Sequence, residues 1–282
     1  MDGVLNVLKP AGMTSFDVIA FLRRVYGQKR IGHGGTLDPM AAGVLPVFLG
    51  KATRLIEYAP IHRKTYEAEF LMGIGTDTED ATGTVIETGT PIADTARWES
   101  AAAAFRGHIE QVPSLYSAKQ IGGRRAYDLA REGKPVALLP KWIDIDRLVI
   151  TGSEPPYLRL SVTCSSGTYV RALGRDLGKA AGCPLTMSFL LRTEMGPFTI
   201  DRAWTLEEIE AAPDAVWSPV ETILGKLPSV RLTEEKGRDF CQGKRLSSDL
   251  SPAEAAAVYA GSRFLGIGRI AGGVLHPKKV FS

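Results

Sequence analysis

The sequence predicts an α+β fold built on a mixed, mostly antiparallel sheet, followed by a small β-rich domain. Three segments support this prediction. Residues 64–72 and residues 158–164 alternate apolar with polar side chains, as strands with one buried face do. Residues 168–180 form a candidate helix that stops before Gly182. Because strands with a single buried face suit mixed or antiparallel sheets, we do not expect an all-parallel architecture.

The N-terminal elements are predicted to be a strand and a helix. Residues 4–8 form a short apolar strand that ends at Lys9. Thr14 and Asp17 have capping-box spacing, with aspartate where glutamate or glutamine is usual. Apolar residues then recur at helical spacing, so we expect a helix that ends near Gly27.

Further along the chain, Tyr66 belongs to the apolar face of the strand at residues 64–72, near its beginning. Residues 95–106 are predicted to be helical behind an Asp94 cap. The chain of 282 residues has room for one large domain and a small one. We place the first at residues 1–224 and the second at 228–282, where segments such as 264–270 resemble short strands.

The composition is that of an ordinary globular protein, with a net charge of +3 that permits nucleic-acid binding without requiring it. We see no apolar run long enough to span a bilayer and no basic leader at the start. Cys164, Cys183 and Cys241 lack CxxC spacing, which argues against disulfides and a zinc site. We therefore expect a cytoplasmic, metal-free protein.

Residues 32–46, GHGGTLDPMAAGVLP, hold the strongest functional candidate. Asp38 is their only acid and lies among glycines and small apolar residues. Burying an unpaired carboxylate costs free energy, and glycines allow a ligand to approach the backbone closely. His33 lies on the same loop and can stack or donate a hydrogen bond. Asp38 could alternatively satisfy backbone amides in a turn, but we favour a catalytic carboxylate.

This segment resembles the catalytic-aspartate motif of the bacterial tRNA pseudouridine-55 synthase family. Five further segments resemble other motifs of the family, in the family's order: KPAGMTS at 9–15, KTYEA at 64–68, TDTEDATG at 76–83, CSSGTYVRALGRDLG at 164–178 and LRTEMGPF at 191–198. The resemblance implies a pseudouridine synthase catalytic domain that isomerises the T-loop uridine at position 55 of tRNA.

Such an isomerisation breaks the N1–C1′ bond of uridine, rotates the base and rejoins it at C5. It exchanges no electrons or groups with solvent, so no cofactor is expected. It requires a carboxylate and a base flipped out of its stack. By resemblance Asp38 is that carboxylate, and attack at C6 of the base or at C1′ of the ribose both remain open.

The resemblance also assigns the surroundings of Asp38. Arg171 would pair with Asp38 and keep it ionised. Tyr66 would stack beneath the base and is a candidate to relay the C5 proton, and Tyr169 would line the same pocket. Taken alone, the arginine could be a solvated helix residue and the tyrosines core residues.

Four more substrate-binding residues follow from the resemblance. His33 would support the extruded nucleotide, Asp80 would contact RNA, and Leu190 would close the pocket on the apolar side of the uracil. Lys9 belongs to the KPAGMTS segment and is placed in the same group. The histidine could also be a satisfied loop residue, and the leucine plain core.

The acids of residues 76–83 have two interpretations. Asp77, Glu79 and Asp80 could bind Mg²⁺, but the sequence of the turn favours Asx-type hydrogen bonds.

Residues 112–141 are basic and aromatic, and resemble the family's thumb-like insertion. Lys119, Arg124 and Arg125 are candidates for an RNA clamp, although a solvated helix face would have a similar composition. Gln120 stands where the family has lysine, which leaves one phosphate contact open. The C-terminal GGVLHPKKVF resembles part of a PUA-type RNA-binding domain, which could instead simply pack on the catalytic domain.

The expected partner is therefore tRNA, through its TΨC stem-loop. We expect a monomer with no obligate protein partner and no membrane association. Three alternatives remain: a non-catalytic tRNA-folding module, the catalytic subunit of a guide-RNA-directed pseudouridylation complex, and a metal nuclease.

Overall fold

The computed structural model describes residues 1–116, 120–121, 124–125, 138–225 and 227–281. Its largest sheet runs in the order β1-β3-β12-β4-β11-β10-β7, with β2 paired to β3 and β13 to β12. The pairs are antiparallel except for β3 with β12. The strands of this sheet are β1 (Gly3–Lys9), β2 (Ile31–His33), β3 (Ala42–Leu49), β4 (Arg63–Met72), β7 (Gly107–Gln111), β10 (Lys141–Glu154), β11 (Tyr157–Ser165), β12 (Leu185–Met195) and β13 (Phe198–Thr199). The predicted α+β class is confirmed.

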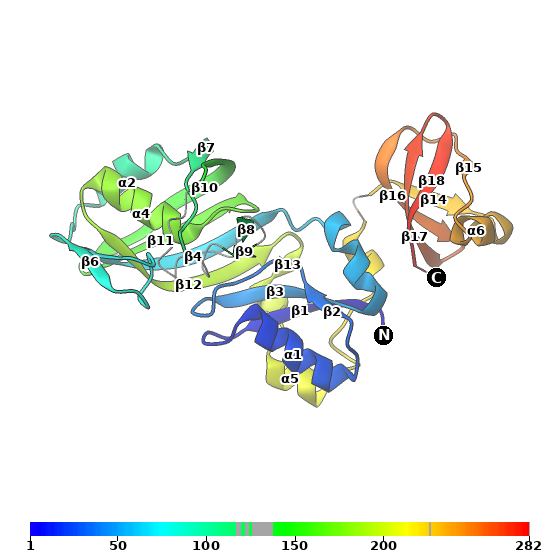
Figure 1. Ribbon diagram of the computed structural model, residues 1–282, viewed down its shortest axis with the longest axis horizontal. Helices are drawn as coiled ribbons and strands as arrows, with labels where there is room; N and C mark the ends of the chain where they lie inside the picture. Colours follow the sequence, from blue (N-terminus) through cyan, green and yellow to red (C-terminus); the bar gives the residue numbers. More distant parts are fainter. Residues whose placement is uncertain (117–119, 122–123, 126–137, 226, 282) are drawn as a thin grey trace.

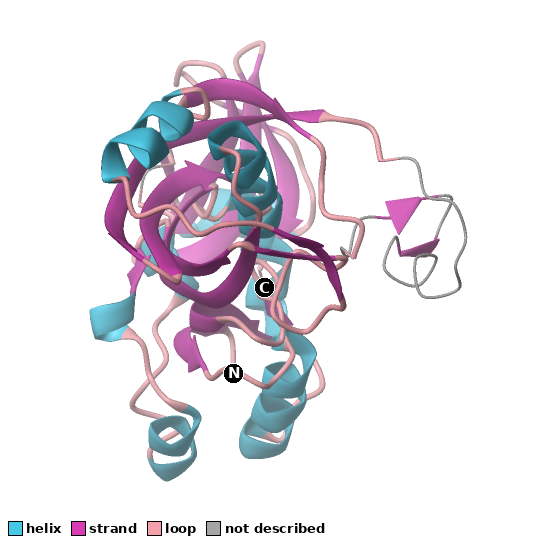
Figure 2. Cartoon of the chain, turned by 90° about the vertical axis from the view of Figure 1, so that its left-hand side faces the viewer, coloured by secondary structure: helices cyan, strands magenta, loops and turns pink. Residues whose placement is uncertain are grey.

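Helices flank the two halves of this sheet differently (Figure 1). At one half, α2 (Thr95–Ala103) contacts β10, α4 (Val170–Ala181) contacts β12, and the two helices contact each other. Figure 2 shows the strands of this half curving beneath the helix pair. At the other half, α1 (Ser15–Tyr26) and α5 (Leu206–Ala211) lie beside β1 and β2.

The local signals in the sequence explain several of these elements. Thr14 and Asp17 form the predicted capping box, and Gly27 ends α1 in the left-handed conformation. Buried and partly exposed side chains alternate along β4, as the pattern predicts. The helix α2 ends at Ala103, earlier than expected, and β7 follows from Gly107.

The start of α4 differs from the prediction by two residues. Thr168 is used in a turn, where its hydroxyl donates to the carbonyl of Ser165, and the helix begins only after Tyr169. Within α4, a Cβ added to Gly174 would lie 2.0 Å from the Phe70 ring. The glycine therefore allows α4 to pack directly on β4.

Residues 229–280 form a second sheet, in the order β14-β16-β17-β18-β15. Its elements are β14 (Ser229–Leu232), α6 (Glu234–Cys241), β15 (Leu246–Ser247), β16 (Ala253–Ala260), β17 (Arg263–Ala271) and β18 (Val274–Val280). This sheet meets the 3-10 helix η1 (Gly50–Tyr58), where Lys279 pairs with Glu57 at 3.0 Å.

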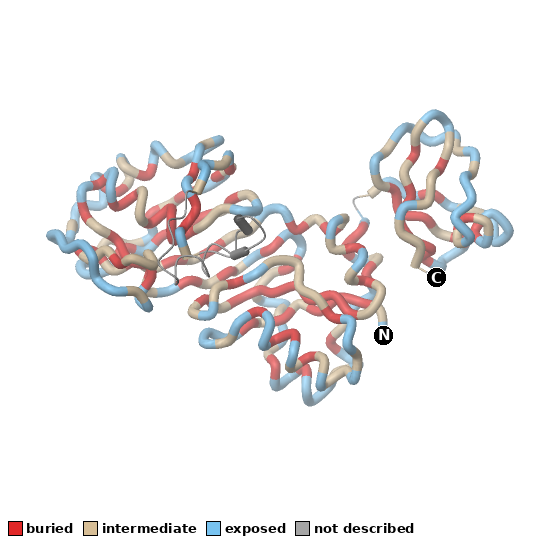
Figure 3. Tube along the Cα trace, in the orientation of Figure 1, coloured by how far each residue is buried: buried red, intermediate tan, exposed pale blue. Residues whose placement is uncertain are grey.

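The remaining described elements are short: β5 (Ile74–Thr76), β6 (Val85–Thr88), β8 (Gln120–Ile121), β9 (Arg124–Arg125), η2 (Ile200–Arg202) and η3 (Val220–Ile223). Buried residues follow the strands of both sheets, whereas the β5–β6 hairpin is exposed over much of its length (Figure 3). In the described part of the chain, no helix is both long and apolar enough to cross a membrane.

Candidate active site

Asp38 lies in a loop of residues 34–41 that joins β2 to β3. This loop is shorter than the sequence suggested, because His33 belongs to β2 and residues 42–49 form β3. The apolar run that follows Asp38 is almost wholly buried between β1 and β12, and a strand buried on both faces shows no alternation in sequence. His33, expected on the same loop as Asp38, therefore lies at the end of the preceding strand.

Lys9 holds the Asp38 loop through the backbone carbonyls of the loop and its surroundings. Its side chain is fully buried, and Nζ donates to the carbonyl oxygens of Ala41 at 2.7 Å, Pro10 at 2.8 Å and Pro39 at 3.4 Å. Burial lowers the pKa of Lys9 to about 8, partly offset by the negative charge of Asp38. The structure thus places Lys9 behind the loop, outside the set of described residues that line the cavity, and its role in substrate binding stays a prediction.

The rest of the KPAGMTS segment holds the same loop. Gly12 N donates to Pro39 O at 2.8 Å. The Ser15 hydroxyl accepts from Leu37 N at 2.9 Å and lies 3.2 Å from Leu37 O, to which it donates. The segment therefore supports the residues on both sides of Asp38.

Arg192 holds the loop from the other side and was not identified from the sequence. It is fully buried on β12, and its guanidinium donates to the carbonyls of Val44 at 2.7 Å, Gly35 at 3.1 Å and Thr36 at 3.4 Å. The only signal in the sequence was its place in the LRTEMGPF segment. A buried arginine with three carbonyl partners fixes backbone position without neutralising the Asp38 carboxylate.

Arg171 forms the direct contact with Asp38. Its Nε lies 3.0 Å from Asp38 Oδ2, and its Nη1 lies 3.3 Å from Asp80 Oδ2. The same guanidinium donates to the carbonyls of Thr78 at 3.2 Å and Tyr116 at 3.0 Å. The Arg171 side chain is 6% exposed, so it is not the solvated helix residue of the alternative interpretation.

Asp80 is buried behind Arg171. Its Oδ1 accepts from Thr82 N at 3.0 Å, from the Thr82 hydroxyl at 2.6 Å and from the Thr78 hydroxyl at 2.8 Å. These are the Asx-type bonds that the turn predicts. A carboxylate so enclosed orients Arg171, and the expected contact of Asp80 with RNA stays a prediction. Among the described residues, no cluster of three or more His, Cys, Asp or Glu side chains could hold a metal ion.

A cavity of about 370 Å³ opens beside Asp38. It is lined by Thr36, Leu37, Asp38, Lys64, Tyr66, Lys141, Gly167, Thr168, Tyr169, Val170, Arg171 and Leu190. Five of the residues proposed from sequence therefore meet in one cavity, although they come from the Asp38 loop, β4, α4 with its N-cap, and β12. The two lysines were not identified as site residues.

The two tyrosines of the cavity are held differently. Tyr66 is 7% exposed, and burial raises the pKa of its phenol, which is therefore neutral near pH 7. Tyr169 is held by its backbone, since its N–H donates to the Gln111 side chain at 2.9 Å and its carbonyl accepts from the same amide at 3.1 Å. Lys141 Nζ lies 4.6 Å from the centre of the Tyr169 ring, a cation–π distance.

His33 does not line this cavity. It is partly buried, its pKa is lowered by burial and by the charge of Arg192, and its Nδ1 has no hydrogen-bond partner within the described part of the chain. Of the predicted clamp, Lys119 lies outside the described residues. Arg124 and Arg125 form β9, paired with β8, and their side chains are not described.

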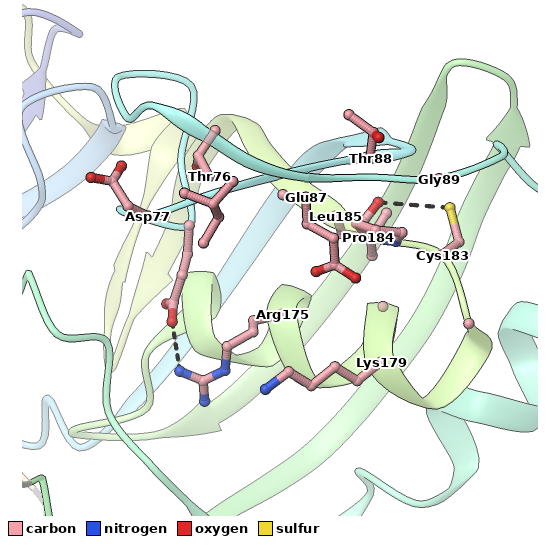
Figure 4. Close-up of a pocket in the computed structure, with 15 residues that line it drawn as sticks. Thr76, Asp77, Glu87, Thr88, Gly89, Arg175, Lys179, Cys183, Pro184 and Leu185 are labelled. Atoms are coloured by element: carbon pink, nitrogen blue, oxygen red, sulfur yellow. Dashed lines mark hydrogen bonds and ion pairs between the residues drawn. The ribbon is translucent and has the colours of Figure 1, made fainter.

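A larger cavity, of about 540 Å³, lies along another side of α4 and contains neither Asp38 nor Tyr66 (Figure 4). Arg175 projects into it from α4 and pairs with Glu79 at 2.5 Å. Size alone therefore does not locate the chemistry, because the aspartate, tyrosines and Arg171 all belong to the smaller cavity.

The comparisons with known proteins agree with this geometry. A model described as "TruB family pseudouridylate synthase (N terminal domain)" matches residues 23–170. The chain belongs to the TruB family. As a TruB family member it is a pseudouridine synthase, an isomerase. A second model, "Pseudouridine synthase II TruB, C-terminal", matches residues 228–281.

Similar proteins match most or all of this chain. A protein named tRNA pseudouridine synthase B from Caldanaerobacter subterraneus subsp. tengcongensis is 42% identical, covering 100% of this chain and 99% of its own. One of the same name from Symbiobacterium thermophilum is 46% identical over 83% of this chain and 79% of its own. The fold also matches a chain in "Crystal Structure of a Cbf5-Nop10-Gar1 Complex", with a TM-score of 0.75 at 23% identity over 99% of this chain and 85% of that one.

Proposed function

We propose that this protein isomerises the uridine at position 55, in the T loop of tRNA, to pseudouridine, with Asp38 as the reacting carboxylate. The observation that carries the proposal is the Asp38–Arg171 ion pair at the wall of the 370 Å³ cavity. Relatives that match the whole chain are named tRNA pseudouridine synthase B, which supports tRNA as the substrate.

The cavity is suited to one flipped nucleoside. Tyr66 offers an aromatic face and Leu190 an apolar contact, and both are buried on the sheet. Stacking on an aromatic ring stabilises a bound base by about 1–3 kcal/mol, which offsets much of the cost of extruding it. Asp38 lies on a charged part of the cavity wall, beside the Arg171 guanidinium. There it can contact the sugar or C6 of the base.

The reaction conserves every atom of the nucleotide. The N1–C1′ bond breaks, the base turns within the cavity, and a C5–C1′ bond forms. C5 then loses its proton, and N1 of the product carries one. Asp38 stabilises the separated sugar as a nucleophile or as a charge partner. Tyr66, with a neutral phenol, would lie beside the base and relay the C5 proton.

Arg171 positions the Asp38 carboxylate for the reaction. Because Asp80 already anchors the guanidinium, Arg171 can hold Asp38 Oδ2 without moving toward the substrate. A second contact, to Tyr116 O, links Arg171 to the start of the basic segment. The proposal also includes RNA binding by that segment and by the domain at residues 228–282. The catalytic domain would end near residue 224.

The test is incubation of purified protein with an unmodified tRNA transcript, followed by carbodiimide mapping of pseudouridine. We expect modification at the T-loop uridine with protein and RNA alone, and none with Asp38→Asn. Modification that required an added guide RNA would favour the guide-directed alternative. Tight tRNA binding without any modification would favour a tRNA-folding module.

A further inference from the structure

Lys64 is the cation of the cavity for which the described residues provide no ion-pair partner. It lies on β4 two residues before Tyr66, so the two side chains share the face of the strand that lines the cavity. The side chains of Lys9 and Arg192 each donate to three backbone carbonyls, whereas the Lys64 side chain makes no hydrogen bond or ion pair within the described part of the structure.

The charges around Lys64 do not supply an anion for it. Arg192 and Lys141 both act on it with positive charge, and Cys164 on β11 is a buried thiol whose pKa is raised by burial. Asp38, the one acid among the described lining residues, is already paired with Arg171. The wall near Lys64 therefore carries excess positive charge.

The beginning of α4 adds to this charge. Residues 167–170, which lead into the helix, line the cavity, and a helix N-terminus favours anions. Lys141 Nζ packs against Gly167, where a Cβ would approach it to 2.7 Å. The Lys64 side chain and the helix end thus present positive charge to one cavity.

Keeping the Lys64 side chain charged in this position is unfavourable in the free protein. Burial, together with the charge of Arg192, lowers the pKa of Lys64 to about 8. Groups perturbed in this way beside a cavity are more frequent at functional sites than elsewhere. An anionic ligand would reverse the perturbation by supplying the missing opposite charge.

We propose that Lys64 binds the phosphodiester adjoining the target uridine and so anchors the flipped nucleotide over Tyr66. This inference rests on the proposed function. Uracil and ribose are neutral, so the phosphates are the groups of the RNA that match the excess charge. Two residues along a strand span about 6.6 Å, enough to separate a stacked base from a phosphate of the same nucleotide.

The experiment removes the charge first from the lysine of the protein and then from the phosphodiester of the RNA. Single-turnover rates are measured against RNA concentration for the parent protein and Lys64→Met, which keeps the length of the side chain. The substrates are T-arm stem-loops with natural linkages, or with a neutral methylphosphonate on the 5′ or the 3′ side of the target uridine.

Lys64→Met should raise the half-saturating RNA concentration about 10- to 100-fold, as loss of a hydrogen bond to a charged group does. One of the two methylphosphonates should weaken binding to the parent by a similar factor and binding to Lys64→Met by less than about threefold. If both methylphosphonates weaken the two proteins equally, or if neither affects the parent, the inference is wrong.

Two controls isolate the contact. Lys179→Met removes the same charge from the exposed C-terminal turn of α4 and should leave binding within about twofold of the parent, as surface substitutions do. Lys64→Arg retains the charge and should recover most of the affinity. A parent protein that formed no pseudouridine in the natural RNA would instead contradict the proposed function, and that outcome is read before any comparison of linkages.

Discussion

Arg171 is buried while the carboxylate it holds is not: Nε lies 3.0 Å from Asp38 Oδ2, yet the Asp38 side chain is 37% exposed and the Arg171 side chain 6%. The ion pair therefore spans the boundary between the protein interior and the cavity. The cation is fixed from within, and the anion keeps an open side toward the substrate.

Asp38→Asn should abolish turnover and leave tRNA affinity nearly unchanged. Asparagine has almost the same volume but can neither attack carbon nor carry negative charge, so single-turnover tritium release from C5-labelled uridine should fall about a thousandfold or more. A variant within tenfold of the parent would show that Asp38 is a structural residue. A variant that no longer binds tRNA would point to a binding role.

Arg171→Met should destabilise the protein as well as inactivate it. It leaves Asp80 buried without its cation, and breaking a buried pair in this way costs about 3–5 kcal/mol. Denaturant unfolding measures the loss. Arg171→Met combined with Asp80→Asn is the matched control, since it removes both charges and should recover part of the stability. Equal stability of the single and double variants would contradict the proposed anchoring role of Asp80.

Ser15→Ala should lower the single-turnover rate, although Ser15 does not line the cavity. It removes the hydroxyl that satisfies Leu37 N, at a cost of about 1–3 kcal/mol, and loosens the residue next to Asp38. We expect a reduced single-turnover rate at saturating RNA. Ser15→Thr, which retains the hydroxyl, serves as the control. Parent-like rates in Ser15→Ala would mean that Lys9 and Arg192 suffice to hold the loop.

RNA affinity should fall as the pH rises from 7 to 8.5. Lys64 in the free protein has a pKa near 8, so it loses its charge across this interval, and a phosphate contact is lost with it. Affinity falls with rising pH because the protonated form of Lys64 is the one that binds phosphate. Lys9 titrates near the same pH but faces backbone carbonyls. Lys64→Met should accordingly show a flatter profile of affinity against pH than the parent, and identical profiles would remove Lys64 as the source.

Replacing Arg124 and Arg125 by alanine should weaken tRNA binding and reduce its salt dependence. Each lost phosphate contact lowers the slope of log affinity against log salt by about 0.7–0.9. The rate at saturating RNA should change much less. A salt slope equal to that of the parent would identify these arginines as a solvated surface.

Local patterns predicted the elements whose signals are local. The Thr14–Asp17 box starts α1, and alternation along residues 64–72 places Tyr66 on the buried face of β4. These features depend on residues within a few positions of each other, so one sequence is enough to identify them.

The cations around Asp38 could not be placed in the same way. Arg192 reaches Val44 across 148 positions of the chain, and Lys9 reaches Ala41 across 32. A buried lysine or arginine has the same letter in the sequence as a solvated one, and only the pairing of β3 with β1 and with β12 reveals the partners of these two residues. For the same reason, the ion pair of Asp80 with Arg171 was not predicted from the sequence.

The Arg192 contacts also set a condition on biosynthesis. The loop that carries the reactive aspartate is made early, but the guanidinium that fixes its carbonyls, and the strand that pairs with β3, follow about 150 residues later. A ribosome adding 5–20 residues per second needs roughly 10–30 seconds to cover that interval. For most of this time the nascent chain has the Asp38 loop but neither Arg171 nor Arg192, which hold it in place. Competence should therefore arise in a single late step, once Arg192 has left the ribosome.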